Sequence, residues 1–95
     1  MTAYVIADVQ VTDPVAYERY RPLAGASIAR FGGRFAVRGG KVDLLEGQPV
    51  PERIVVIEFP DLETARSWYR SEEYQSALKI RQAASRGRVF LVEGA

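Results

Sequence analysis

The alternation of apolar and polar residues along the chain predicts four β-strands. Every second residue is apolar over Ala3–Val11, Arg34–Arg38, Arg53–Phe59 and residues 88–93. Successive side chains of a strand point to opposite faces of a sheet, so this period of two is typical of strands with one buried face. The strand that begins at Arg53 should stop before Pro60, because proline lacks the N–H group that a sheet needs.

A longer spacing predicts the first helix. Tyr17, Tyr20, Ala24, Ile28 and Phe31 recur at intervals of three and four residues, which places them on one side of an amphipathic helix of about five turns. This helix should bury that side against the sheet.

Residues at both ends of this segment support the prediction of the first helix. Asp13 and Pro14 form a start signal, because the aspartate accepts bonds from free N–H groups and proline fits the first helical position. Pro22 should kink or split the helix. Gly32 and Gly33 should end it, one of them in the left-handed conformation.

Two further helices are expected in the second half of the chain. Residues 62–69 follow Asp61 and carry Leu62, Ala65, Trp68 and Tyr69 on one side. Ser71 should cap another helix over residues 72–85, which we expect to end at Gly87.

The order of elements predicts an α+β fold. Residues 41–46 should form a short extended piece after Gly39 and Gly40, and residues 47–52 should form an irregular loop. The order β-α-β-(β)-β-α-α-β is the split β-α-β pattern of ferredoxin-like folds, with an antiparallel sheet in the strand order last, first, third, second.

The two faces of this sheet differ in character. The face that should lie under the helices is wholly apolar and comprises Val5, Ala7, Val9, Phe35, Val37, Val55, Ile57, Phe59, Val89 and Leu91. The other face is apolar at its centre and charged around it, and comprises Tyr4, Ile6, Asp8, Gln10, Arg34, Ala36, Arg38, Ile54, Val56, Glu58, Arg88, Phe90 and Val92. With no helix left to cover this second face, we expect a homodimer that packs two sheets face to face.

Composition narrows the classes of function. The 95 residues should form one domain, 1–95. The net charge of +1 is too small to attract nucleic acid, so we expect no nucleic-acid partner. No apolar stretch is long enough to span a bilayer, and the alternating N-terminus does not resemble a signal peptide, so we expect a cytoplasmic protein. The chain has no cysteine and no histidine. This excludes thiolate and histidine metal sites and Ser–His catalysis, so we expect no metal and no cofactor.

Short motifs along the entire chain resemble one family. They are D-P-V-A-Y-E-R-Y at 13–20, F-G-G-R-F at 31–35, R-G-G at 38–40, L-E-G at 45–47, V-I-E-F-P at 56–60, A-R-S-W-Y-R-S-E-E-Y-Q at 65–75 and L-V-E-G at 91–94. In this order and spacing the chain resembles the domain of unknown function 1330 family, within the dimeric α+β barrel superfamily. The resemblance implies the fold and the dimer but no agreed activity. Relatives in the wider superfamily include cofactor-free monooxygenases acting on polycyclic phenols, isomerases, haem-binding enzymes and small-ligand proteins.

Two carboxylates on the open face are the candidate catalytic groups. Asp8 or Glu58 could act as a base in a pocket. Cross-strand ion pairs of Asp8 with Arg88 and of Glu58 with Arg34 are the favoured alternative, because opposite charges often face each other across antiparallel strands at the rim of an interface.

A second set of residues is the candidate ligand site. It comprises Tyr17, Tyr20, Arg38, Trp68, Tyr74 and Arg81. Aromatics at helical spacing usually belong to a core, so we expect Trp68 in the core, although the set could also flank an aromatic ligand. Arg81 is either a buried ion-pair partner, which we favour, or an anion clamp.

Two functions remain open from the sequence. The first is a dimeric small-ligand binding or structural protein, with a ligand that is aromatic or anionic. The alternative is a cofactor-independent enzyme of monooxygenase or isomerase type.

Overall fold

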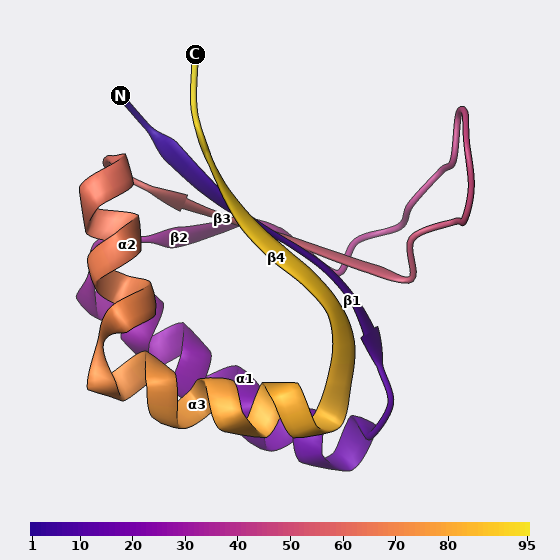
Figure 1. Cartoon of the computed structure of the whole chain (residues 1–95), viewed down its shortest axis with the longest axis horizontal. Coiled ribbons are helices and arrows are strands. Elements are labelled where there is room, and N and C mark those ends of the chain that lie inside the picture. The colour runs from indigo at the N-terminus through magenta and orange to yellow at the C-terminus, as the bar shows by residue number, and fades with distance from the viewer.

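The computed structural model describes all residues from Met1 to Ala95 as a four-stranded antiparallel sheet with three helices (Figure 1). The elements follow in the order β1 (Ala3–Val11), α1 (Pro14–Arg30), β2 (Arg34–Arg38), β3 (Arg53–Phe59), α2 (Leu62–Arg70), α3 (Glu72–Ala84) and β4 (Ser85–Glu93). The strand order β2-β3-β1-β4 is the one predicted from the sequence. The α+β ferredoxin-like fold is therefore confirmed.

The helices begin at the residues that the sequence indicated. Asp13 accepts a hydrogen bond from the Ala16 N–H, and Asp61 accepts one from the Thr64 N–H. The bond from Thr64 holds the pKa of the Asp61 carboxyl below its usual value. Ser71 caps α3 by accepting from the Tyr74 N–H.

Of the two outcomes expected at Pro22, a split is excluded, because α1 continues through this residue to Arg30. Two other expectations about the elements are wrong. No strand forms over residues 41–46, which belong to a long loop. Gly87 does not end α3, because α3 stops at Ala84 and Gly87 lies inside β4 opposite Val9. A side chain at Gly87 would collide with the backbone oxygen of Asp8. The close approach of β4 to β1 therefore explains why this position is a glycine.

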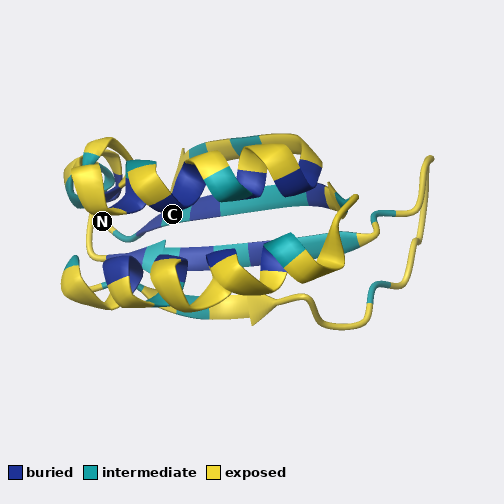
Figure 2. Ribbon diagram, turned by 90° about the horizontal axis from the view of Figure 1, so that it is seen from below, coloured by how far each residue is buried: buried dark blue, intermediate teal, exposed yellow.

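The core lies between the sheet and the helices. Its largest fully buried side chains are Trp68, Tyr74 and Phe59, and the Trp68 ring centroid lies 4.0 Å from that of Tyr74. Figure 2 shows buried positions along the strands and helices, whereas the loop between β2 and β3 is almost entirely exposed. The prediction that Trp68 belongs to the core is confirmed.

The helices cover the sheet unequally. The helices α2 and α3 contact strands of the sheet directly, whereas α1 packs mainly against α3. Side chains rather than close backbone contact therefore bridge α1 and the sheet, and this arrangement leaves room for a cavity there.

An irregularity in β2 changes which residues face the helices. The register against β3 shifts between Phe35 and Val37, so that Val37 pairs with Val56 and Arg38 pairs with Val55. Residues paired across antiparallel strands share a face. The assignment of Val37 to the helix side and Arg38 to the open side is therefore wrong, because the bulge exchanges them.

Candidate functional site

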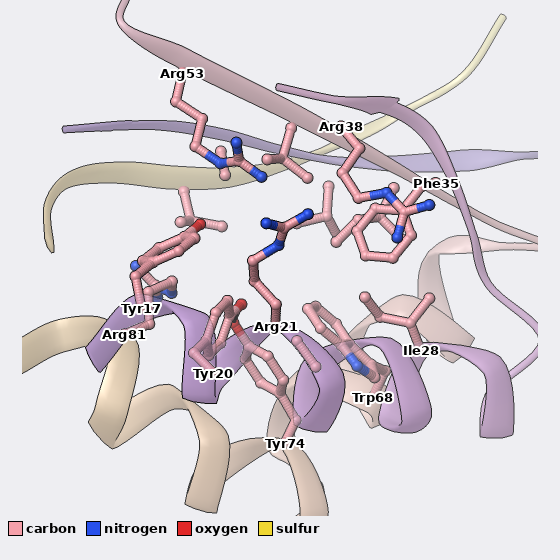
Figure 3. Close-up of a pocket in the computed structure, with 16 residues that line it drawn as sticks. Tyr17, Tyr20, Arg21, Ile28, Phe35, Arg38, Arg53, Trp68, Tyr74 and Arg81 are labelled. Atoms are coloured by element: carbon pink, nitrogen blue, oxygen red, sulfur yellow. Dashed lines mark hydrogen bonds between the residues drawn. The ribbon is translucent and has the colours of Figure 1, made fainter. Parts of the chain in front are cut away.

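A cavity lies between α1 and the sheet, at the side of β2 and β3 (Figure 3). About 50 Å³ of it is open to the centres of water molecules. Twelve of the sixteen residues that line it are hydrophobic, and the other four are arginines. The lining comprises Val5, Ala7, Tyr17, Tyr20, Arg21, Ala24, Ile28, Phe35, Arg38, Arg53, Val55, Ile57, Trp68, Tyr74, Arg81 and Val89. The cavity thus combines apolar walls with positive charge and contains no carboxylate.

Three of the arginines form the rim. In Figure 3 the side chains of Arg38 and Arg53 reach inward from the sheet, and Arg21 extends from α1 toward them. The Arg38 guanidinium lies 4.4 Å from the centroid of the Phe35 ring, and that of Arg53 lies 5.5 Å from the Tyr17 ring. These cation–π contacts orient the guanidinium groups without neutralising them.

Only one of these rim arginines has an acidic partner. Arg21 Nη1 lies 3.0 Å from Glu18 Oε1 at an exposed position of α1. Arg38 and Arg53 take part in none of the five salt bridges, and Arg53 Nε is buried without a hydrogen-bond acceptor. Two uncompensated cations therefore face the cavity.

Gly39 makes room for one of them. Its φ of +69° is a left-handed conformation, and a Cβ at this position would overlap Arg53 Nη1 and lie 2.9 Å from Arg53 Cζ. The Gly39 N–H donates to the Ile54 carbonyl at 2.9 Å, which ties the turn after β2 to β3. The glycine thus sets where the Arg53 guanidinium lies.

The inner wall carries a pair of tyrosine hydroxyls. The hydroxyl oxygens of Tyr20 and Tyr74 lie 2.8 Å apart, and both side chains are buried. Burial, together with Tyr74, raises the pKa of Tyr20 well above its ordinary value of 10.0. Tyr20 is therefore protonated at neutral pH.

Arg81 lies beside these tyrosines and is 9% exposed. Its Nε has no hydrogen-bond acceptor, and it forms no salt bridge. Burial opposes its charge, but Tyr74 and Tyr20 offset that effect and the pKa of Arg81 is raised. The favoured interpretation of Arg81 as an ion-pair partner is therefore wrong, because no carboxylate reaches it.

Trp68 closes one end of the cavity. Its indole N–H donates to Ser27 Oγ at 3.0 Å, and the Ser27 hydroxyl donates to the Ala24 carbonyl at 2.8 Å. This chain fixes the ring against α1, so that Trp68 presents an apolar wall while its only polar group is satisfied.

The two carboxylates considered as catalytic groups lie elsewhere. Asp8 and Glu58 do not line the cavity. Asp8 Oδ2 lies 3.8 Å from Arg88 Nε, and Glu58 pairs with Arg34, in the cross-strand register that the sequence indicated. Both ion pairs are therefore confirmed, and both carboxylates occupy the open face of the sheet.

Two residues of the cavity were missed from the sequence. Arg53 precedes Val55 and Ile57 at the same two-residue spacing, so the alternation of β3 places it on the helix side of the sheet. Arg21 lies four residues after Tyr17, on the same side of α1. Parity and helical spacing were thus the available signals.

Comparison with known proteins agrees with this architecture. The antiparallel sheet with three helices defines a ferredoxin-like α+β protein. The model of the family described as Domain of unknown function (DUF1330) matches residues 2–95, so the chain belongs to this family. No curated protein matches the sequence.

Several solved structures share the fold. A protein of unknown function from Rhodopseudomonas palustris is 21% identical, with a TM-score of 0.79 over 99% of this chain and 82% of that one. SnoaB, a cofactor-independent oxygenase from Streptomyces nogalater, is 16% identical, with a TM-score of 0.71 over 99% and 93%. A dimeric protein of unknown function from Bacteroides fragilis is 13% identical, with a TM-score of 0.53 over 98% and 95%. At these identities the similarity establishes the fold alone.

The chain has neither a membrane-spanning helix nor a cluster of acidic residues suited to a metal ion. None of the three helices has both the length and the hydrophobicity needed to cross a bilayer. No group of three or more acidic side chains comes together in a way that could hold a metal ion.

Proposed function

We propose that this protein is a homodimeric binding protein for a small anionic aromatic molecule, which enters the cavity between α1 and the sheet. The observation that carries the proposal is the presence of Arg38 and Arg53 at the rim of an apolar cavity without any carboxylate partner. A guanidinium group can hold a carboxylate through two parallel hydrogen bonds, and aromatic walls favour a flat apolar body.

The charge balance inside the cavity supports an anion rather than a neutral ligand. Buried charges are ordinarily paired, since an isolated charge is costly to remove from water. Of the four arginines that line the cavity, Arg81 is buried and Arg53 is half-buried with a buried Nε, and neither has an acidic partner. A bound anion would supply the missing negative charge.

The same lining favours binding over the enzymatic alternative. A cofactor-independent oxygenase or isomerase needs a group that can remove a proton near neutral pH. The cavity has no carboxylate, and the raised pKa of Tyr20 keeps its hydroxyl protonated. This lining therefore supports binding over the oxygenase activity in the name of SnoaB.

The homodimer rests on the uncovered face of the sheet. Phe90 and Val92 on this face are 42% and 45% exposed, and Val37 joins them at 40%. The ion pairs of Asp8 and Glu58 lie on the same face. A second copy that covers the apolar centre would leave the charged pairs near its rim, the usual division of an interface. One structural neighbour is described as dimeric.

Titration with benzoate tests the ligand proposal. Trp68 is the only tryptophan and lines the cavity, so its fluorescence should change as benzoate binds. Benzyl alcohol, which is similar in size but neutral, should bind at least tenfold more weakly, because a hydrogen bond to a charged group contributes about 1.5–3 kcal/mol. Equal affinity for benzoate and benzyl alcohol would refute the proposal.

Arginine variants locate the site. Arg38→Met and Arg53→Met should each weaken benzoate binding about tenfold through the loss of a charged donor. Arg19→Met is the matched control, because Arg19 is exposed on α1 and outside the cavity. Unchanged affinity in both cavity variants would contradict the assignment of the site.

A further inference from the structure

The inner end of the cavity holds hydrogen-bond donors that no acceptor in the protein uses. Arg81 is nine-tenths buried, and its Nε has no partner although it lines the cavity. In a protein interior a donor without an acceptor is destabilising, and the great majority of such groups are paired. An unpaired, buried guanidinium N–H next to an open space calls for an acceptor that occupies that space.

The tyrosine pair supplies a second free donor. Each phenolic hydroxyl carries one proton, so Tyr20 and Tyr74 bring two protons to their shared contact at 2.8 Å. One proton forms the bond between the two oxygens and the other is left over, whichever hydroxyl donates. A hydrogen bond from Arg81 to the Tyr74 oxygen, which helps to raise the pKa of Arg81, uses a lone pair of that oxygen and leaves this count of protons unchanged. The spare O–H group and Arg81 Nε both belong to residues that line the cavity.

The two ends of the cavity therefore differ in what they would recognise. At the rim, Arg38 is exposed and Arg53 is half-buried, and two guanidinium groups without an acidic partner suit a carboxylate. At the inner end, donors without a nearby acceptor suit a single oxygen that accepts hydrogen bonds. The other walls of the cavity are apolar, with Phe35, Ile28 and Trp68 among them (Figure 3).

The size of the cavity limits the body of the ligand. One water molecule needs roughly 10–15 Å³ of space measured at its centre, so about 50 Å³ corresponds to a few adjacent water positions. This space suits the body of a single ring better than a polycyclic one.

We propose that the ligand is a single-ring aromatic carboxylate that carries an oxygen acceptor on the ring, with its carboxylate between Arg38 and Arg53 and its ring oxygen at Arg81 and the tyrosine pair. This inference rests on the proposed function, since it takes the same cavity and adds the identity of the second polar group. The ring oxygen acts as an acceptor, so a carbonyl substituent serves as well as a hydroxyl.

Calorimetry with a set of benzoates tests the inference. Benzoate has the carboxylate alone, hydroxybenzoates add an oxygen that both donates and accepts, and formylbenzoates add one that only accepts. The meta and para isomers of each are titrated separately, so that the position of the oxygen is covered. At least one hydroxybenzoate and the matching formylbenzoate should bind about tenfold more tightly than benzoate.

Two variants assign this preference to the inner end. The double variant Tyr20→Phe/Tyr74→Phe removes both hydroxyls of one hydrogen bond and keeps the shape of both rings. Arg81→Met removes the guanidinium group and keeps most of the aliphatic stem, and the thermal midpoint of each variant shows that it is folded. In each variant the ratio of the affinity for the oxygen-bearing benzoate to the affinity for benzoate should fall toward one, while benzoate still binds. Arg19→Met again serves as the control and should keep the full preference.

The outcomes separate the two proposals. If benzoate and its oxygen-bearing derivatives bind the wild type with equal affinity, this inference is wrong and the proposed function stands. Failure of every benzoate to bind would overturn the proposed function and this inference with it. A preference that survives in both inner-end variants would also overturn the inference, because the ring oxygen would then lie elsewhere.

Discussion

Replacing Gly39 by alanine should weaken anion binding, because the new side chain should displace Arg53, a residue far from position 39 in the sequence. An alanine Cβ at position 39 would overlap Arg53 Nη1 and lie 2.9 Å from Arg53 Cζ. The backbone has little freedom to yield, because the Gly39 N–H is bonded to the Ile54 carbonyl. The guanidinium is the end of a flexible side chain, so it should move and leave the rim of the cavity.

Two separate effects follow, and their magnitudes can be worked out. The φ of +69° at Gly39 costs an alanine about 1–2 kcal/mol in the left-handed region, which lowers the free energy of unfolding. Displacement of Arg53 removes a charge-assisted hydrogen bond to the bound carboxylate, which contributes about 1.5–3 kcal/mol. At 1.4 kcal/mol for each factor of ten, benzoate should bind at least tenfold more weakly.

Two other glycines of the same loop separate these effects. Gly47 has a φ of +89° and Gly40 has no positive φ, and a Cβ at either position meets nothing within 4 Å. Gly47→Ala should therefore lower stability by a similar amount but leave benzoate binding unchanged. Gly40→Ala should change neither quantity.

The measurements are urea unfolding at one fixed protein concentration and benzoate titration followed by Trp68 fluorescence. Fixed concentration is needed because the stability of a dimer depends on it. The reasoning fails if Gly39→Ala binds benzoate as tightly as Gly47→Ala, since the position of Arg53 would then not depend on Gly39.

Three further predictions concern the core, the open face and pH. Trp68→Ala should lower the free energy of unfolding by about 3–5 kcal/mol, the usual cost of deleting a buried large aromatic. Tyr69→Ala is the control and should cost less, because Tyr69 is 38% exposed; a loss below about 1 kcal/mol for Trp68→Ala would contradict the core assignment. Ile6→Glu and Val56→Glu should each dissociate or unfold a dimer that buries more than about 1,200 Å² in total, whereas Val15→Glu on the exposed side of α1 should not. Sedimentation at micromolar concentration checks this, and a monomeric wild type would refute the homodimer. The pKa of Tyr20 in the folded protein is raised above 10.0, so the unfolded chain loses the Tyr20 proton at a lower pH than the folded protein does. The contribution of Tyr20 to the free energy of unfolding should therefore be constant below pH 10 and should fall as the pH rises further. The fall in urea midpoint from about pH 9 to about pH 11 should be smaller in Tyr20→Phe, and an equal fall in both proteins would count against a buried, protonated Tyr20.

Local patterns in the sequence determined most of the fold. The period of two in β1 and β3, the caps at Asp13, Asp61 and Ser71, and the order of elements were sufficient for the ferredoxin-like topology. These features depend on residues close together in the chain, so they can be recognised without knowledge of tertiary contacts. The same alternation, with the known strand order, also predicted the cross-strand ion pairs.

The end of α3 shows where local signals misled the prediction. Gly87 suggested a helix end, but the helix stops before Ser85, whose hydroxyl donates to the Arg81 carbonyl at 2.7 Å. Gly87 is instead required by the close approach of β4 to β1 at Asp8. That requirement arises from a strand nearly eighty positions away, so no local pattern contains it.

The candidate site depended still more on tertiary structure. The sequence nominated Tyr17, Tyr20, Trp68, Tyr74 and Arg81 from helical spacing, and all five line one cavity. It could not show that Arg81 lacks an acidic partner, because salt bridges depend on side chains brought together from distant elements.

The direction of Arg38 was decided by one irregular step in β2. Simple alternation sends Arg38 to the open face, whereas the register shift after Phe35 pairs it with Val55 and turns it into the cavity. A single inserted residue reverses every later side chain of a strand. The sequence by itself therefore determined the fold and most of the residues near the cavity. The tertiary structure decided which charges meet there, because burial, register and the absence of a partner are properties of the packed molecule.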